Sequence, residues 1–235
     1  MTSSPLPETA AVLGTFITTV REDAGWDSEI DIICHSVGTC IARHLLEVID
    51  GTERQERVRQ LIGLGPSNKD SALAELICNP QFGPGIIDRL TGVFVPKGFN
   101  PDKDPLVQDV HPSRSVMKAL RASGIRKDIY YRVIVTANPT GIPAFFPNFS
   151  GETYDSSEDG TVRMTRNGDG IVTPRESELP EVTLDVLPAG NESDKPLPAP
   201  DQYSHIRLSR NPVVIDQMMK YCYDFVKKRL CRIPQ

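Results

Sequence analysis

The stretch Ile30-Asp31-Ile32-Ile33-Cys34-His35-Ser36-Val37-Gly38 decides the fold that this sequence predicts. A short apolar run ends in a compact turn that carries a serine, and residues 39–49 then repeat apolar side chains at helical spacing. This pattern predicts a strand, a tight turn and a helix. Such a turn exposes the hydroxyl of Ser36 at the end of a sheet. The N-terminus of the helix directs its backbone N–H groups and the positive end of its dipole to the same place.

The residues around Ser36 resemble a known motif. Cys34-His35-Ser36-Val37-Gly38 and the helix at 40–47 are similar to the nucleophile elbow of α/β-hydrolase lipases and esterases, which reads G-x-S-x-G. Gly38 matches the second glycine, and Cys34 replaces the first. Because the cysteine side chain is small, we expect the turn to tolerate it. The resemblance implies that Ser36 is a nucleophile, whereas an ordinary serine at a helix N-terminus is the alternative that this stretch leaves open.

Length and charge exclude several other classes of protein. The chain has 235 residues, of which 39% are hydrophobic, which suits one globular domain with a sizeable core. The net charge is −5 and no basic stripe is present, so we expect no nucleic-acid partner. No apolar run approaches the ~20 residues of a membrane span, and the N-terminus lacks a signal-peptide pattern. We therefore expect a cytoplasmic protein without a transmembrane segment.

The cysteines favour reduced thiols. Their number is five, which is odd, and they contain no C-x-x-C pair, so disulfides are not expected. Cys34, His35, Cys40 and His44 form a local cluster that must be weighed as a metal site. The cluster lacks the usual ligand spacing, and the resemblance around Ser36 explains it better. We therefore expect neither a metal nor another cofactor.

The order of the predicted elements indicates a parallel sheet. Strands are predicted over 30–34, 57–64, 129–137 and 182–187, with helices over 7–25, 39–49 and 72–78 between them. Asn211-Pro212 marks the start of a final helix, because proline is favoured at the first helical position. This alternation predicts an α/β fold with a mainly parallel sheet flanked by helices, in one domain over 1–235. The resemblance around Ser36 implies that this is a partial α/β-hydrolase fold. The apolar face of the first helix is marked by Val12, Leu13, Phe16, Ile17 and Val20.

A candidate cap lies at about 72–125. Residues 72–108 mix prolines with apolar residues and predict only the helix at 72–78, and Ser113 is a candidate N-cap for a further helix. In the hydrolases that this chain resembles, an apolar insertion at this place forms a cap or lid over the acyl pocket. A packed, irregular connection is the equal alternative.

A serine nucleophile needs a base, and the base needs an acid that orients it. Asn167-Gly168-Asp169-Gly170-Ile171-Val172 resembles the acid loop of lipase-like hydrolases and implies that Asp169 is the acid. Asp159, in a partly similar loop, is the alternative. The chain order in this fold is serine, acid, histidine. Of the four histidines only His205 follows Asp169, and the resemblance implies that it is the base.

The acid loop also fits a rival pattern. From Thr165 to Glu176 the oxygen-bearing residues have the spacing of an EF-hand calcium loop. The loop begins with Thr165 rather than aspartate, no helix is predicted before it, and Pro174 interrupts it. Calcium binding is therefore the less favoured alternative.

The resemblance covers about residues 8–230, which correspond to the C-terminal two-thirds of the usual fold. The family has earlier strands, one of which leads into a His-Gly loop that gives an N–H to the oxyanion hole. Nothing in residues 1–8 can be that strand or loop, so we expect a fragment or a degenerate hydrolase. The backbone N–H of Val37 is one expected oxyanion donor, and the loop from Phe145 to Gly151 is a candidate source of the second.

Together these features predict a serine hydrolase that cleaves small-molecule or lipid carboxylic esters, as an esterase or lipase. Ser36 would form the acyl-enzyme, with His205 as base, Asp169 as its orienting acid and Val37 in the oxyanion hole. Acyl transfer through the same intermediate is the alternative enzyme, and a catalytically inactive binding protein is the alternative outside enzymes. Without upstream neighbours the strand at 30–34 would have an unpaired edge, so we expect self-association.

Overall fold

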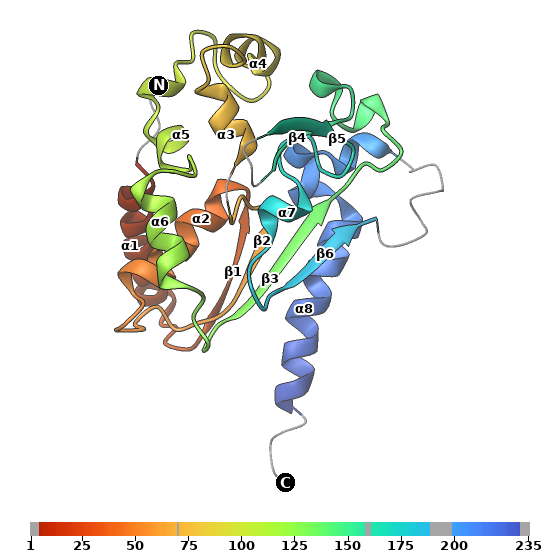
Figure 1. The fold of residues 1–235 in the computed structure, drawn as a ribbon. Coiled ribbons are helices and arrows are strands. Elements are labelled where there is room, and N and C mark those ends of the chain that lie inside the picture. Colours follow the sequence, from red (N-terminus) through yellow and green to blue (C-terminus); the bar gives the residue numbers. More distant parts are fainter. Residues whose placement is uncertain (1–4, 70, 158–160, 189–198, 231–235) are drawn as a thin grey trace.

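The structure is a computed structural model that describes residues 5–69, 71–157, 161–188 and 199–230. Its centre is a four-stranded sheet in the order β1-β2-β3-β6 (Figure 1), formed by Ile30–His35, Val58–Leu64, Tyr130–Thr136 and Thr183–Leu187. All three neighbouring pairs are parallel. The carboxyl ends of the strands therefore point to one end of the molecule, the upper end in Figure 1. The predicted mainly parallel α/β arrangement is confirmed.

Helices cover both faces of the sheet. One face packs against α2 (Val37–Arg43) and the π-helix η1 (His44–Ile49), with Ala42, Leu46, Leu61, Tyr131 and Val133 in the buried contact. The other face packs against η7 (His205–Arg210) and α8 (Pro212–Leu230), with Ile62, Leu64, Ile134, Leu208 and Val214 buried. Neighbours along a strand point to opposite faces, which explains why the strands are apolar without alternation.

The first helix, α1 (Leu6–Ala24), packs beside η1 through Ala10, Ile17 and Leu45. It ends at Gly25, which has a φ of +59° that glycine adopts without strain. The predicted apolar face was wrong in part, because Val12, Phe16 and Val20 are 66%, 62% and 47% exposed. The small residues Ala10 and Gly14 are buried instead. Helix α1 therefore meets the rest of the protein through a face that contains Ala10, Gly14 and the predicted Ile17, and Val12, Phe16 and Val20 lie outside it.

Residues 72–125 contain more helix than their sequence predicted. The helices are α3 (Ala72–Ile77), α4 (Gly83–Leu90), α5 (Pro105–Asp109) and α6 (Ser115–Ser123), with a 3-10 turn, η2 (Pro101–Lys103), before α5. Ser113 is not the N-cap of α6, because Arg114 holds that position. The hydroxyl of Ser113 instead lies 3.0 Å from Nδ1 of His111. None of the described helices is both long and apolar enough to cross a lipid bilayer.

The connection between β3 and β6 was predicted as a long loop and holds several short elements. A hairpin of β4 (Thr153–Ser156) and β5 (Val162–Thr165) is antiparallel and separate from the main sheet. The others are η3 (Pro143–Phe145), η4 (Pro147–Phe149), α7 (Pro174–Ser177) and, after β6, η6 (Pro200–Tyr203). The hairpin and α7 flank the loop that carries Asp169, above the carboxyl ends of the strands (Figure 1).

Strand β1 forms one edge of the sheet in the described part of the chain, as expected. The N–H of Ile30 donates to Arg57 and that of Ser36 to Leu64, so alternate residues of β1 face β2. The backbone groups of Asp31, Ile33 and His35 therefore face away from the sheet. The side chain of Ile33 is 44% exposed there.

Candidate active site

Ser36 lies in the sharp turn between β1 and α2. Its φ of +54° and ψ of −132° fall in a region that residues other than glycine rarely adopt. Its N–H donates to the carbonyl of Leu64 at 2.8 Å, which anchors the turn to the end of β2. The hydroxyl lies 2.8 Å from Nε2 of His205.

His205 joins Ser36 to Asp169. Its Nδ1 lies 2.8 Å from Oδ2 of Asp169, and its backbone N–H donates to the carbonyl of Asp169 at 2.9 Å. Both residues are fully buried. The structure thus brings together the three residues predicted from the sequence in one hydrogen-bonded chain, although Ser36 and His205 are 169 positions apart.

The carboxylate of Asp169 is held from two sides. Its Oδ1 accepts the backbone N–H groups of Ile171 at 3.0 Å and Val172 at 2.8 Å, which leaves Oδ2 for His205. Gly65, at the end of β2, has a φ of +57° and lies directly against this contact. A Cβ there would come within 3.0 Å of Oδ2 of Asp169 and 3.1 Å of Nδ1 of His205. Only glycine fits beneath the carboxylate–imidazole pair.

A small apolar pocket of about 170 Å³ opens beside Ser36. Its walls come from α2, the loop after β2, α3, the turn at 91–95 and α5, and they include Val37, Cys40, Leu73, Ala74, Ile77 and Phe94. The ring of Phe94 lies with its centroid 6.4 Å from that of His205, in an edge-on arrangement. The pocket thus has one polar end, at Ser36, and apolar walls suited to a hydrocarbon chain.

Sequence comparisons give no relative, because no family model and no curated protein sequence matches the chain. Solved structures do match. The mature form of the Bacillus licheniformis lipase BlEst2 superposes with a TM-score of 0.61 at 17% identity, over 93% of this chain and 74% of the lipase. The chain has an α/β-hydrolase-like fold. This confirms the resemblance at the level of fold.

Two further solved structures with an α/β-hydrolase-like fold also match the chain. Phospholipase PlaB from Legionella pneumophila has a TM-score of 0.52 at 16% identity, over 91% of this chain and 48% of the phospholipase. The metagenomic carboxyl esterase MGS0156 has a TM-score of 0.51 at 13% identity, over 92% of this chain and 61% of the esterase. The chain therefore spans between about half and three-quarters of the proteins that share its fold.

The two expected sources of oxyanion donors lie in different surroundings. Val37 is the first residue of α2, where the N–H has no acceptor within the helix, and it lines the pocket beside Ser36. The loop from Phe145 to Gly151 does not line the pocket, and Phe145, Phe146 and Phe149 are buried in the core. Ser67, which follows β2, does line it. In the sequence, Ser67 is marked only by its place after the end of a predicted strand.

The sequence left two alternatives for the loop that carries Asp169: Asp159 as the acid, and an EF-hand calcium loop. Asp159 lies outside the described residues. In the EF-hand pattern the final ligand, Glu176, instead accepts the N–H of Ala72 with Oε1 and that of Thr173 with Oε2, both at 2.7 Å. Thr173 and Glu176 form a capping box at the start of α7. The carboxylate of Asp169 therefore contacts His205 and its own loop, whereas that of Glu176 accepts N–H groups at the starts of α3 and α7.

The cysteines near Ser36 carry protonated thiols at neutral pH. Burial, and to a lesser extent Cys40, raises the pKa of Cys34 to about 11, and burial raises the pKa of Cys40 to about 11. Thiols in this state are poor nucleophiles. Within the described ranges, no three His, Cys, Asp or Glu side chains group in a way that could hold a metal ion.

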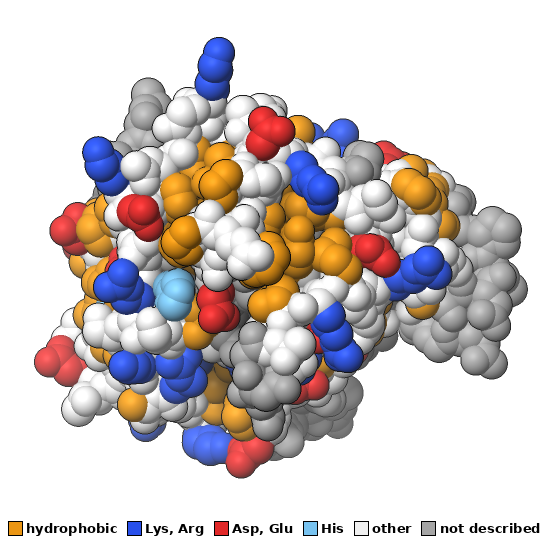
Figure 2. Space-filling model, turned by 45° about the horizontal axis from the view of Figure 1, so that its top comes forward, with side chains coloured by type: hydrophobic (Ala, Val, Ile, Leu, Met, Phe, Trp, Pro, Cys, Tyr) orange, Lys and Arg blue, Asp and Glu red, His pale blue; other side chains and the backbone are white. Residues whose placement is uncertain are grey.

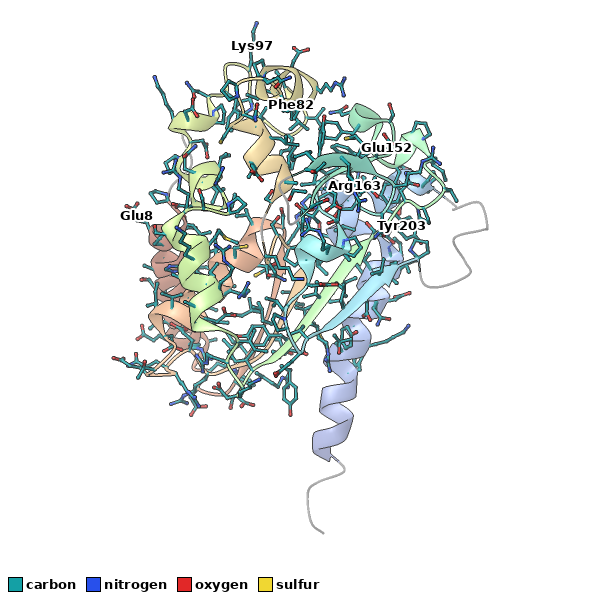
Figure 3. All side chains as sticks on the ribbon, viewed as in Figure 1. Glu8, Phe82, Lys97, Glu152, Arg163 and Tyr203 are labelled. Carbon is teal, nitrogen blue, oxygen red and sulfur yellow. The ribbon has the colours of Figure 1, made fainter. Side chains whose placement is uncertain are left out.

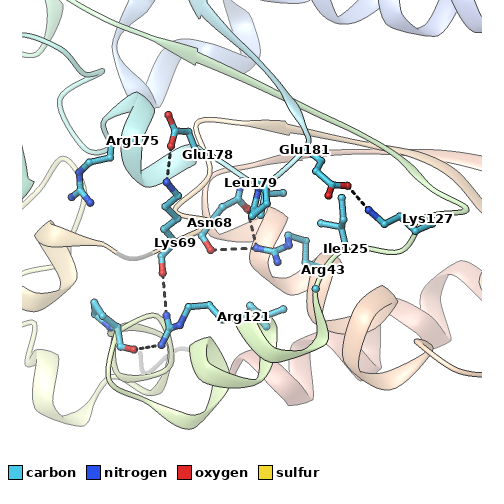
Figure 4. Close-up of a pocket in the computed structure, with 14 residues that line it drawn as sticks. Arg43, Asn68, Lys69, Arg121, Ile125, Lys127, Arg175, Glu178, Leu179 and Glu181 are labelled. Carbon is cyan, nitrogen blue, oxygen red and sulfur yellow. Dashed lines mark hydrogen bonds and ion pairs between the residues drawn. The ribbon is translucent and has the colours of Figure 1, made fainter. Parts of the chain in front are cut away.

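A larger groove of about 850 Å³ lies on the far side of the loop at 67–69 (Figure 4). Its cations are mostly matched: Lys69 pairs with Glu178 at 2.6 Å, and Lys127 pairs with Glu181. Arg43 forms a buried pair with Glu47 at 2.8 Å, and Arg175 with Asp155 at 3.0 Å. The fifth, Arg121, donates to the carbonyls of Lys69 and Pro112. The groove is larger than the pocket at Ser36. Ser36 and His205 are not among the described residues that line it.

Proposed function

We propose that this protein is a serine hydrolase that cleaves carboxylic esters, as an esterase or lipase, through an acyl-enzyme on Ser36. The observation that carries the proposal is the chain of hydrogen bonds from Ser36 through His205 to Asp169, with both contacts at 2.8 Å. A serine, a histidine and a carboxylate in this order form the usual arrangement for activating a hydroxyl. The neighbouring structures support the reaction class, because they are named as a lipase, a phospholipase and a carboxyl esterase.

The reaction would proceed in two halves. Nε2 of His205 takes the hydroxyl proton of Ser36 while Oγ forms a bond to the ester carbonyl carbon, and Asp169 stabilises the imidazolium through Nδ1–H. The tetrahedral intermediate then expels the alcohol, which receives the proton from Nε2. In the second half a water gives its proton to His205 and attacks the acyl group. The carboxylic acid leaves and Ser36 regains its proton.

The oxyanion of each tetrahedral intermediate needs donors that point at it. The N–H of Val37 at the start of α2 is the first donor that we propose, and the dipole of the helix adds to it. For the second we propose the hydroxyl of Ser67. Its support is that Ser67 and Val37 line the same small pocket as Ser36.

The pocket walls favour a short acyl chain. The segment at 72–125 supplies most of them through α3, the turn at 91–95 and α5, so we propose that this segment serves as the cap. Apolar side chains gather on the end of the molecule that carries α4 (Figure 2). Phe82, which points outward there with Lys97 (Figure 3), is 48% exposed, and Val93 and Phe94 are 55% and 42% exposed. This end would meet an apolar ester substrate.

A fluorophosphonate probe tests the nucleophile directly, because it reacts only with an activated serine. The wild-type chain should be labelled, Ser36→Ala should abolish labelling, and Ser113→Ala, a matched change of an exposed serine, should leave it intact. Labelling that survives Ser36→Ala would assign the nucleophile to another residue. A wild-type chain that is well folded but never labelled would favour the inactive binding protein instead.

Acyl transfer differs from hydrolysis only in the acceptor of the second half-reaction. Turnover of a p-nitrophenyl ester in the presence of a primary alcohol separates the two. We expect free acid to dominate, because the pocket beside Ser36 is open to solvent. A product that is mostly the new ester would establish the transferase.

A further inference from the structure

His35, the residue before Ser36, contacts the segment that carries the base. Its Nε2 lies 2.8 Å from the backbone carbonyl oxygen of His205. A carbonyl oxygen can only accept, so Nε2 of His35 carries the proton and donates it. Strand β1 thus reaches across to His205 independently of the hydroxyl of Ser36.

The bond from His35 completes the restraint of His205. The backbone N–H of His205 donates to the carbonyl of Asp169, and its ring nitrogens contact Asp169 and Ser36. The backbone carbonyl of this fully buried residue stands at the start of η7, and Nε2–H of His35 donates to it. His35 is the last residue of β1 and Ser36 follows it directly in the turn, so adjacent residues contact the imidazole and the backbone carbonyl of His205.

The ring of His35 also lies close to the ring of His205, with 4.8 Å between the centroids. Burial lowers the pKa of His35, and the nearby His205 lowers it further, against the opposing effects of the carbonyl bond and of Asp169. His35 is accordingly neutral at neutral pH. A neutral ring at this distance does not repel an imidazolium at His205, whereas a second cation would.

We propose that His35 is a positioning residue for His205: its Nε2–H holds the carbonyl of His205, and with it the imidazole, in line with the hydroxyl of Ser36. The inference rests on the proposed function for its effect on turnover. The restraint itself is a property of the fold and can be tested without substrate.

A matched pair of amides tests the proposal. In His35→Gln the amide nitrogen takes the place of Nε2 and keeps a neutral donor, whereas in His35→Asn the amide is one methylene too short to reach the carbonyl. We expect His35→Gln to retain kcat within a few-fold. We expect His35→Asn to lose roughly tenfold to a hundredfold in kcat with little change in KM, the usual cost of misplacing a catalytic group. Equal kcat values for the two variants would overturn the proposal.

Proton NMR gives a readout that does not depend on turnover. The proton between Nδ1 of His205 and Asp169 should give a downfield resonance in the wild type and in His35→Gln. In His35→Asn it should broaden or vanish through exchange while the melting temperature stays close to that of His35→Gln. A resonance that is unchanged in His35→Asn would refute the restraint. Loss of the resonance in a chain whose Ser36→Ala variant is still labelled would support the restraint while rejecting Ser36 as nucleophile.

Discussion

The backbone of Ser36 is strained, and the strain can be measured apart from the chemistry. Its φ of +54° and ψ of −132° cost a residue with a side chain about 1–3 kcal/mol. Ser36→Ala and Ser36→Gly both remove the hydroxyl, but only glycine relaxes the turn. Allowing for the extra chain entropy of unfolded glycine, we expect Ser36→Gly to be more stable than Ser36→Ala by about 1 kcal/mol in denaturant unfolding. Equal stability would show that the turn is not strained.

Asp169 sets the tautomer of His205. In Asp169→Asn the amide oxygen would keep the N–H groups of Ile171 and Val172, so the amide nitrogen would face Nδ1 of His205. Nδ1 would then have to accept, Nε2 would carry the proton, and His205 could no longer take one from Ser36. We expect kcat to fall by about 10⁴-fold. Asp155→Asn, which weakens the ion pair between the buried carboxylate of Asp155 and the partly exposed Arg175, should lower the melting temperature and leave kcat largely intact.

Ser67 and Ser71 offer a comparison for the oxyanion hole, because both line the pocket. The hydroxyl of Ser71 caps α3 by accepting the N–H of Ala74 at 3.2 Å, so Ser71→Ala should cost about 1 kcal/mol of stability and little kcat. Ser67→Ala should lower kcat by roughly a hundredfold or more, as loss of an oxyanion donor does. A normal kcat in Ser67→Ala would show that the hydroxyl of Ser67 is not the second oxyanion donor.

Sequence patterns predicted the residues with distinctive chemistry better than those that support them. Ser36, Asp169 and His205 each stand in a recognisable local motif or chain order, and the structure brings them together. Gly65 and His35 serve the same site through contacts with residues more than 100 positions away. No local pattern records such contacts. Ser113 shows the opposite case, where a good capping residue bonds to His111 instead.

At the level of elements, α3 supplies the pocket wall that is simplest to alter. Ala74 is buried and faces the pocket, so Ala74→Leu should fill space that an acyl chain would use. We expect kcat/KM for p-nitrophenyl hexanoate to fall by at least tenfold relative to that for the acetate. Ala122→Leu, on the exposed side of α6, should change neither. A hexanoate-to-acetate ratio unaffected by Ala74→Leu would place the acyl chain elsewhere.

The short elements α4, α5, β4 and β5 were not predicted, and the reason is physical. Helix α4 has Pro84 in its first turn and α5 begins with Pro105, and proline ordinarily indicates a turn as readily as a helix start. Neither helix is long enough to show a repeating apolar face. The strands β4 and β5 have four residues each and stabilise one another, so their pairing depends on tertiary contacts rather than on β-propensity.

On the scale of the whole molecule, we predict that the chain self-associates through the open edge of β1. Ile33 projects beside unpaired backbone groups there, and a lysine at such an edge blocks pairing between strands. We expect the chain to sediment as a dimer or larger species, and Ile33→Lys to shift it toward the monomer. Val12→Lys alters a different exposed apolar surface, on α1, and should have no effect. If Val12→Lys alone produced the monomer, α1 would be the contact instead.

The separation of Ser36 and His205 along the chain has a consequence for folding kinetics. The loop that their hydrogen bond closes spans 169 positions, and contacts of such high sequence separation are slow to form. Strand β1, the Asp169 loop and the segment beginning at His205 must all be docked before the hydroxyl has a base. If Ser36 is the nucleophile that we propose, a chain whose C-terminal region is still unfolded carries an inert serine. The return of serine reactivity during refolding would then report the completion of the fold, not its onset.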